Sequence, residues 1–324
     1  MSEQRIDQQE ARPAVEQYRA TKLERAFRYA KRFWFVYLLA LPAVLHTFVF
    51  KYIPMYGLLI AFKDYNIRKG ILRSPWVGLE NFRIIVQDAY FYKVLTNTVL
   101  INVYNLAFGF TFVIFLALML NELKSGWLKK TVQTFVYLPH FVSWVVFAGL
   151  VMIALEPTKE GIVNGILARW GHEPIYFLVQ RNMFRGILVL SGMIKEAGFG
   201  TIIFLAALSS VNPELMESAV MDGCHRGHMI WHIYLPRISP TIAVLLILRV
   251  ARLFASNFDQ VWNLYNPAVY ETGDVLSTYL YRSGLLQGKF EMATALGLVF
   301  AVIGLITVIL TNRLISRMNV MGIF

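Results

Sequence analysis

The chain has 324 residues, of which 57% are hydrophobic and only 16% charged, and its mean hydropathy is +0.52. A soluble domain carries about a quarter charged residues, so this composition excludes a soluble globular protein and indicates one embedded in a lipid bilayer. The net charge of +11 points first to lysines and arginines at a membrane surface, and the single cysteine, Cys224, excludes disulfide frameworks and cysteine-rich metal sites.

The first 32 residues form a polar segment of mixed charge that contains eight lysines and arginines. No short apolar core with a small-residue cleavage site follows this segment, so it is not predicted to be a secretory signal. Basic residues gather on the cytoplasmic side of membrane proteins. The sequence therefore predicts a basic cytoplasmic tail, both termini in the cytoplasm, and a multi-pass protein of the bacterial inner membrane.

The apolar residues that follow the tail fall into six stretches long enough to cross about 30 Å of hydrocarbon. They predict an all-α membrane domain over residues 33–320. Pro42 and Pro54 lie inside the first span and Pro139 inside the third, where neighbouring helices can satisfy the backbone groups that a proline leaves unpaired. The predicted spans cover about residues 33–61, 94–120, 131–155, 184–208, 238–258 and 292–314.

The connection between the fourth and fifth spans, residues 209–237, contains the most specific local pattern. Asn212 suits a helix N-cap, and Pro213 and Glu214 suit the first helical turn. Gly223 stands where a helix would end in a left-handed conformation. A second short helix is expected over residues 226–234 and should end at Leu235-Pro236. Two short helices joined at a glycine corner predict a rigid docking element rather than a solvated loop.

The same connection resembles the cytoplasmic EAA signature of permease subunits of bacterial binding-protein-dependent ABC importers. The family's glutamate, alanine, aspartate-glycine and isoleucine-leucine-proline positions are matched in order, whereas Ser218 and Cys224 replace usual alanines and Ile230 a common aromatic residue. The resemblance implies the type I importer architecture and coupling to the ATP-hydrolysing subunit through Glu217, Ala219, Asp222, Gly223, Ile233, Leu235 and Pro236.

Other segments are similar to carbohydrate-importer permeases of the polysaccharide (LplB-like) branch, including those of alginate-oligosaccharide importers. They are Tyr52–Gly57, Ala61–Asn66, Ser74–Phe82, Tyr137–Trp144 and Tyr265–Glu271. The resemblance implies a transporter subunit, not an enzyme, that forms the path for oligosaccharides. It also implies a second related permease, two ATP-binding subunits and an extracytoplasmic sugar-binding protein as partners. ATP and magnesium would be bound by the partner ATPase, no cofactor by this chain, and no nucleic acid by the complex.

Ionisable residues inside predicted spans usually face a cavity, because a charge at the centre of a span costs at least about 2.5 kcal/mol. Lys195 and Glu196 lie in the fourth span, and Arg249 and Arg252 lie three residues apart on one face of the fifth. An excess of positive charge suits acidic sugars such as uronate oligomers through bidentate arginine–carboxylate contacts. The predicted translocation path comprises Lys195, Glu196, Arg249, Arg252, Asn257 and Trp144.

Internal pairing of Glu196 with a nearby cation is the structural alternative to a role in the path. Neutral oligosaccharides would instead use amides and aromatic platforms, for which Asn102, Asn105 and Trp262 are available, although aromatic residues in membrane helices more often pack or lie at the interface. We call residues 209–237 the docking connection. Three histidines in it share a helix face without a suitably spaced acidic residue. They favour contact with a partner over a metal site.

Two other classes of function stay open at this stage. A secondary transporter driven by an ion gradient would use Lys195 and Glu196 as an ion relay, but it gives the two-helix connection no purpose. A membrane enzyme acting on lipid-linked sugars would need clustered catalytic groups, whereas Asp259, Glu271 and Asp274 are scattered along one connection without a histidine.

Overall fold

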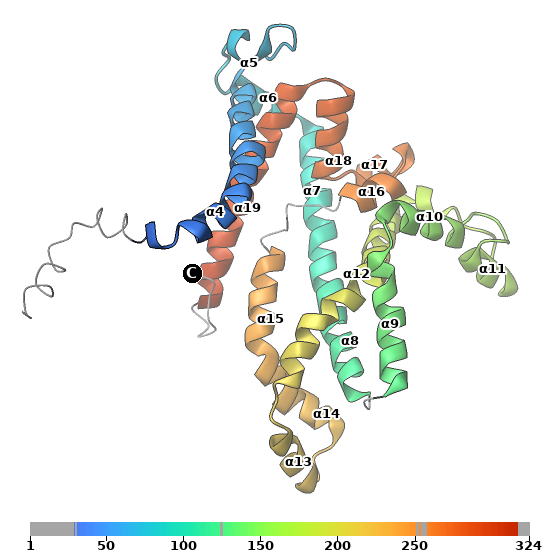
Figure 1. The fold of residues 1–324 in the computed structure, drawn as a ribbon. Coiled ribbons are helices and arrows are strands. Elements are labelled where there is room, and N and C mark those ends of the chain that lie inside the picture. Colours follow the sequence, from blue (N-terminus) through green and yellow to red (C-terminus); the bar gives the residue numbers. More distant parts are fainter. Residues whose placement is uncertain (1–28, 30, 124–125, 251–252, 254–257, 317–324) are drawn as a thin grey trace, which may run out of the picture. The chain divides into compact units, whose positions relative to one another are not determined.

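The computed structural model describes residues 29, 31–123, 126–250, 253 and 258–316, which divide into two compact units, Met1–Leu59 and Ile60–Phe324. The regular elements in these ranges are all helical (Figure 1). Five described helices are long and apolar enough to cross a membrane, or six if one bent pair is counted as a single span. The prediction of an all-α protein with about six spans is confirmed.

The described part of the first unit is a single apolar rod. It consists of α4 (Trp34–Thr47), the π-helical turn η2 (Phe48–Tyr52) and the beginning of η3 (Ile53–Phe62), and it coincides with the predicted span 33–61. No residue of α4 or η2 is buried within the chain. A helix that is hydrophobic on every side needs lipid or other protein around it.

The second unit is built around long helices. The first is continuous over residues 89–122 and comprises α7 (Ala89–Tyr104), the π-helical turn η4 (Asn105–Phe110) and α8 (Thr111–Glu122). Its first turn is capped by the Asp88 carboxylate, which accepts a hydrogen bond from the Tyr90 amide at 2.8 Å. The helices α12 (Arg181–Ser209) and α19 (Phe290–Ser316) correspond to the fourth and sixth predicted spans.

Small residues let α12 pack closely against α8 and α9. At Gly198 an added Cβ would meet the backbone carbonyl of Val136 on α9 (Trp127–Phe141), and at Gly200 it would lie 3.1 Å from Val113 on α8. Gly198 therefore packs directly against the α9 backbone and Gly200 against a side chain of α8, so that three helices meet at positions that larger side chains would crowd.

The predicted span 131–155 corresponds to a bent pair of helices, because the chain turns by 106° between α9 and α10 (Trp144–Ala154). The Ser143 hydroxyl begins α10 by accepting a hydrogen bond from the Val146 amide at 3.4 Å. The last carbonyls of α9, those of Pro139 and His140, accept hydrogen bonds from the Lys195 ammonium group at 3.3 and 2.9 Å. These side chains therefore satisfy three of the backbone groups that the bend would leave unpaired.

The helix that follows the docking connection also differs from its prediction. The short helix α14 (Arg226–Met229) does not end at Leu235-Pro236 but continues through the π-helical turn η6 (Ile230–Tyr234) into α15 (Leu235–Val250). A proline lacks the amide that an α-helix uses at that position, and the wider turn lies immediately before it. The described helix ends at Val250, and the rest of the predicted span 238–258 lies outside the described residues apart from Leu253 and Phe258.

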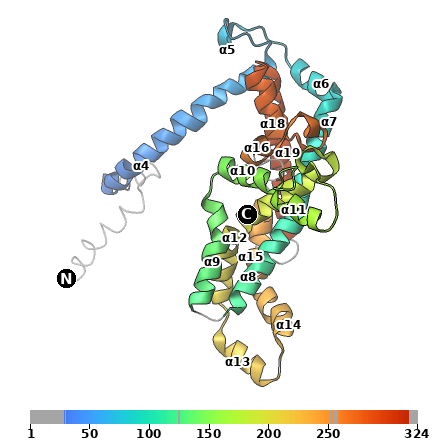
Figure 2. The same cartoon turned by 90° about the vertical axis from the view of Figure 1, so that its right-hand side faces the viewer.

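The connections at the two ends of the second unit are also helical. Views in two directions place α13 (Pro213–Met221) and α14 at one end and α5 (Gly70–Arg73) and α6 (Glu80–Gln87) at the other (Figures 1 and 2). The remaining short elements are α11 (Ile162–Arg169), η5 (Phe177–Val179), α16 (Phe258–Leu264), η7 (Pro267–Val269), α17 (Tyr270–Gly273), α18 (Leu276–Leu280) and η8 (Tyr281–Leu286).

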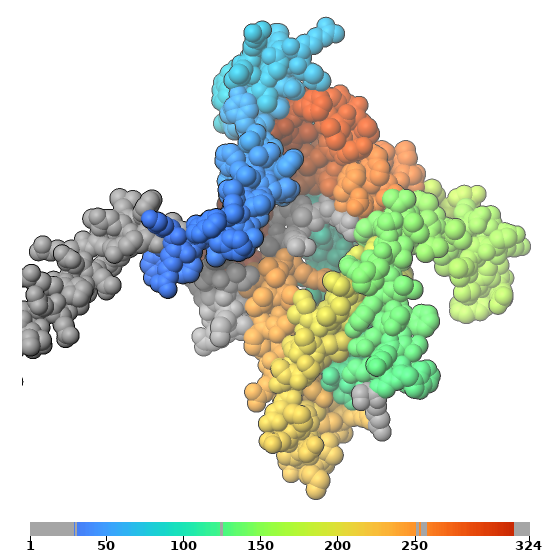
Figure 3. All heavy atoms as spheres, in the orientation of Figure 1, coloured from blue at the N-terminus to red at the C-terminus, as the bar shows by residue number. Residues whose placement is uncertain are grey.

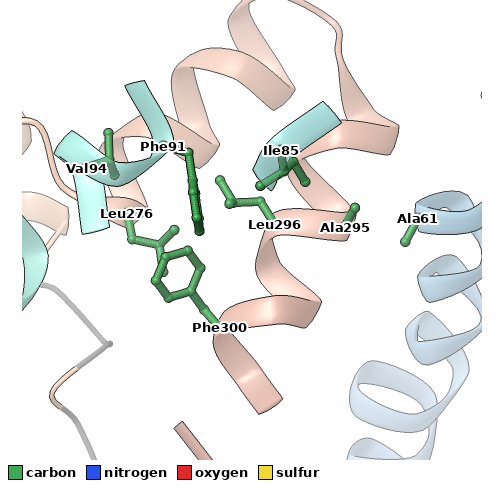
Figure 4. Close-up of a cluster of buried hydrophobic side chains, with 8 residues drawn as sticks. All are labelled: Ala61, Ile85, Phe91, Val94, Leu276, Ala295, Leu296 and Phe300. Atoms are coloured by element: carbon green, nitrogen blue, oxygen red, sulfur yellow. The ribbon is translucent and has the colours of Figure 1, made fainter. Parts of the chain in front are cut away.

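Buried apolar side chains gather in three clusters within the second unit. Figure 4 shows one of them, where Phe91 of α7 and Phe300 of α19 meet Leu276 of α18. A second cluster joins α7, α10, α12 and α16, and a third joins α8, α12 and α15 around Phe204 and Ile238. The third cluster connects the helices on both sides of the docking connection.

We expect Gly198→Ala to destabilise the protein, because the added methyl group would push α12 away from the α9 backbone. Overpacking of this kind costs about 1–3 kcal/mol, and about 2–4 °C of thermal midpoint accompanies each kcal/mol in domains of 150–250 residues. The measurement is the thermal midpoint of the detergent-purified chain at a fixed scan rate. Gly186→Ala is the matched control, since an added Cβ at Gly186 on the same helix meets nothing within 4 Å. Equal midpoints for the two variants would contradict this account.

Candidate functional site

A cavity of about 330 Å³ lies among the long helices of the second unit. Its wall is formed by α7 with η4, by α10, α12, α15 and α16, so that segments from most of the unit meet there. The wall combines apolar residues with a small set of polar and aromatic side chains: Asn102, Asn105, Trp144, Glu196, Arg249 and Gln260. A cavity that combines an apolar wall with a few fixed polar groups is the usual form of a small-molecule site.

Two of the three side-chain amides in the cavity wall, those of Asn102 and Gln260, are held by hydrogen bonds to the surrounding helices. The Asn102 side chain donates to the carbonyl of Thr98 at 2.8 Å. The Gln260 side chain donates to the carbonyl of Leu188 at 2.5 Å and to the Ser191 hydroxyl at 3.0 Å. Each amide therefore has a fixed orientation and keeps its oxygen as a further acceptor.

Arg249 and Glu196 are the charged residues of the cavity wall. The guanidinium carbon of Arg249 lies 5.2 Å from the centre of the Phe110 ring, within the range of a cation–π interaction. The Glu196 carboxylate lies 2.7 Å from His140 Nδ1 and 3.6 Å from the Lys195 ammonium group. Glu196 thus lines the cavity and is also paired with His140 and Lys195.

Lys195 is placed differently from its prediction, because it does not line the cavity. Its side chain is only 4% exposed and reaches toward the end of α9, where it binds the two carbonyls at the bend. Its ammonium group also lies 5.3 Å from the centre of the Trp144 ring. A cation at the C-terminus of a helix is favourable, and this position lets Lys195 fix both the bend and an aromatic residue of the cavity.

Three of the six residues predicted for the path, Trp144, Glu196 and Arg249, come together around the cavity. Arg252 and Asn257 lie outside the described residues. Gln260 was missed, because it follows the end of the predicted fifth span and was read as part of a connection. Its signal in the sequence is weak, because α16 also contains Asp259 and Asn263 and reads as a polar connection.

The docking connection forms a second candidate site, at the end of the second unit where α13 projects (Figure 3). The Asn212 side chain accepts a hydrogen bond from the Glu214 amide at 3.0 Å and caps α13 as predicted. Gly223 has φ +78°, the left-handed conformation expected for the glycine corner. His225 caps α14 through a hydrogen bond from the His228 amide to its Nδ1 at 3.1 Å.

The seven predicted coupling residues divide between an exposed and a partly buried group. Glu217, Asp222, Gly223 and Pro236 are exposed, while Ala219, Ile233 and Leu235 are half-buried. Leu235 packs against the cluster of apolar residues that joins α8, α12 and α15. The connection therefore presents polar groups, a turn and the exposed apolar side chains of Val220, Met221 and Trp231 outward, while Leu235 attaches it to the long helices.

The histidines of this connection form an exposed column. The rings of His228 and His232 stack with centroids 3.8 Å apart. Among the described residues, no group of three or more histidine, cysteine, aspartate or glutamate side chains is arranged to hold a metal ion.

Two of the three carboxylates considered for an enzyme, those of Glu271 and Asp274, take part in structural contacts. The Asp274 side chain is fully buried and accepts hydrogen bonds from Tyr90 (2.6 Å), Arg282 (2.5 Å) and Thr278 (2.7 Å). Burial lowers the pKa of the Arg282 guanidinium, but the hydrogen bond to Asp274 and the charge of that carboxylate outweigh burial and raise this pKa above its ordinary value. Glu271 forms ion pairs with other basic residues.

Comparison with known proteins assigns the chain to a family. Residues 109–320 match the family described as "Binding-protein-dependent transport system inner membrane component". The polygalacturonan/rhamnogalacturonan transport system permease protein YteP of Bacillus subtilis (strain 168) is 41% identical over 290 residues, 90% of each chain. Protein LplB of the same strain is 38% identical over 294 residues, 91% of this chain and 92% of LplB.

A solved structure is similar over its whole length. A chain of the bacterial alginate ABC transporter, crystallised in complex with an alginate pentasaccharide-bound periplasmic protein, is 42% identical and has a TM-score of 0.85. The match covers 93% of this chain and 100% of that one. The family match, these identities and the helical architecture agree, and the chain belongs to the inner membrane components of binding-protein-dependent transport systems, as a multi-pass permease subunit of an ABC importer and not an enzyme.

Proposed function

We propose that this permease subunit forms the translocation path for acidic oligosaccharides, and that the cavity is part of that path. The observation that carries the proposal is the charge around the cavity. Arg249 lines the wall, and the single carboxylate there, Glu196, lies beside the Lys195 ammonium group. With two cations for one anion, the local charge is positive and suits a sugar carboxylate. Transport of polygalacturonan by YteP and of alginate by the solved transporter supports the same class of cargo.

The proposed orientation places the docking connection and both termini in the cytoplasm. There the connection would bind an ATPase subunit through its exposed polar residues, and ATP and magnesium would be held by that partner rather than by this chain. A second related permease would complete the path, and an extracytoplasmic binding protein would deliver the sugar. Closure of the ATPase pair would move α13 and, through the apolar cluster that joins α8, α12 and α15, the helices that line the cavity.

Neutral oligosaccharides are the alternative cargo, and they also have a specific observation in their favour. The amides of Asn102, Asn105 and Gln260 and the ring of Trp144 all line the cavity. Such groups bind hydroxyl-rich sugars without requiring a carboxylate. The two cargo classes are distinguished by how the uptake of each sugar changes when one positive charge is removed from the cavity wall.

The proposed function is tested by purifying the tagged chain from native membranes with its bound partners and reconstituting the complex in liposomes. We expect a second permease and an ATPase subunit to remain bound, and uptake of oligogalacturonate or alginate oligosaccharides to require ATP and the binding protein. Uptake that follows an ion gradient and continues without ATP would instead support a secondary transporter and contradict the proposal.

Arg249→Gln should weaken the uptake of acidic oligosaccharides more than that of neutral ones of equal length. A hydrogen bond to a charged group contributes about 1.5–3 kcal/mol, so the concentration for half-maximal uptake of the acidic sugar should rise at least about tenfold. The neutral sugar serves as the internal control in the same liposomes. An equal change for both sugars would remove the charge argument and favour the neutral alternative.

Two substitutions at Gly223 distinguish the effect of the backbone conformation at this glycine corner from the effect of side-chain size. An added Cβ meets nothing within 4 Å, but φ is +78°, and this conformation costs about 1–2 kcal/mol for most residues and less for asparagine. We therefore expect Gly223→Ala to lower ATP hydrolysis stimulated by the binding protein more than Gly223→Asn does. If crowding against the ATPase subunit decided the outcome, the larger asparagine would be the worse substitution.

A further inference from the structure

The segment between η3 and α6 carries an exposed surface that the cavity and the docking connection do not use. We call it the loop-tip surface and define it by the exposed side chains of Ile67, Arg68, Lys69, Leu72, Arg73 and Trp76. Its three apolar members are 61–79% exposed. The segment lies at the end of the second unit opposite α13 and α14 (Figure 2).

The loop-tip surface is strongly basic. Arg68, Lys69 and Arg73 are all exposed, and no acidic residue occurs between Asp64 and Glu80. The proposed orientation places this segment outside the cytoplasm, where basic residues are normally sparse, yet residues 62–92 contain five of them. The positive-inside rule therefore does not account for these basic residues. Their charge suits contact with an acidic partner.

The backbone beneath this surface is held by a network of hydrogen bonds. The Asn66 amide donates to the Ser74 hydroxyl at 3.0 Å, and that hydroxyl donates to the carbonyl of Gly70 at 2.7 Å. The Lys63 ammonium group donates to the carbonyls of Leu72 and Ser74 at 3.3 and 3.2 Å. The loop is therefore preformed, which reduces the entropy lost on binding.

Trp76, the aromatic residue of the loop-tip surface, is also held in place by its neighbours. The Trp76 ring stacks on Phe62 with centroids 5.6 Å apart, and the backbones of Trp76 and Lys63 form an antiparallel bridge. The Asn81 side chain, which is buried, donates to the carbonyls of Ala61 and Lys63 at 2.9 and 3.0 Å. Trp76 thus presents a large apolar ring from a rigid position.

From these observations we infer that the loop-tip surface docks an acidic face of the sugar-loaded extracytoplasmic binding protein. Tryptophan and arginine dominate the binding energy of protein interfaces, and both are presented here on a fixed backbone. Lipid headgroups would be attracted to the same residue types, but they require no preformed backbone. The inference rests on the proposed orientation and specifies which surface receives the partner.

The test uses the complete importer in nanodiscs and, as its probe, the binding protein that stimulates its ATP hydrolysis. Arg73→Glu should raise the concentration of binding protein for half-maximal stimulation at least about fivefold, and the maximal rate should stay unchanged, because the side chain is exposed and distant from the docking connection. Leu72→Ser should raise the same concentration without altering its dependence on salt, whereas Arg73→Glu should weaken that dependence. Arg169→Glu, a charge reversal of an exposed arginine on α11, is the matched control and should change neither.

Three results would overturn the inference. One is a stimulation curve for Arg73→Glu that matches that of the wild-type importer. Another is a loss that appears only in nanodiscs containing phosphatidylglycerol and not in those of phosphatidylcholine, which would identify the surface as a lipid anchor. The third is an equal loss for Arg73→Glu and the control, which would show a general effect of charge. Failure of the proposed function differs from all three, since the wild-type importer would then show no stimulation by a binding protein and no ATP-dependent uptake.

Discussion

The contact between the Lys195 ammonium group and the end of α9 is the interaction on which the arrangement of the cavity depends. A 106° bend inside the membrane exposes backbone carbonyls, and in an apolar environment each unpaired group costs several kcal/mol. Lys195 binds two of those carbonyls from α12. The bend in turn begins α10 at Trp144, so the position of one wall of the cavity depends on a residue that does not line it.

Local features of this protein could be predicted from the sequence, and contacts between distant residues could not. The apolar stretches, the Asn212 cap and the left-handed Gly223 each depend on residues within a few positions of one another. The role of Lys195 depends on partners 55 and 56 residues away, so an intramembrane lysine was read as part of the path. Gln260 was missed for a related reason, because α16 is positioned by packing rather than by its own length.

Two helices connect the docking connection with the cavity directly. The continuous helix formed by α14, η6 and α15 carries the predicted coupling residues Ile233 and Leu235 in its first half and Arg249 near its end. On the other side of the connection, α12 carries Glu196 and ends just before Asn212. The apolar cluster around Phe204 joins both helices to α8. A displacement of α13 is therefore applied to two walls of the cavity through rigid elements rather than through flexible loops.

The π-helical turns have a consequence for the register of these helices. One of them, η4, contributes Asn105 and Gly109 to the cavity wall, and another, η6, lies between α14 and α15. A π-turn holds one residue more than an α-turn, and one residue corresponds to about 100° of rotation in a helix of 3.6 residues per turn. Conversion of η4 to regular α-helix would therefore rotate every side chain of α8 relative to those of α7, and the third apolar cluster, which holds Val113 and Ala117 of α8, would have to repack.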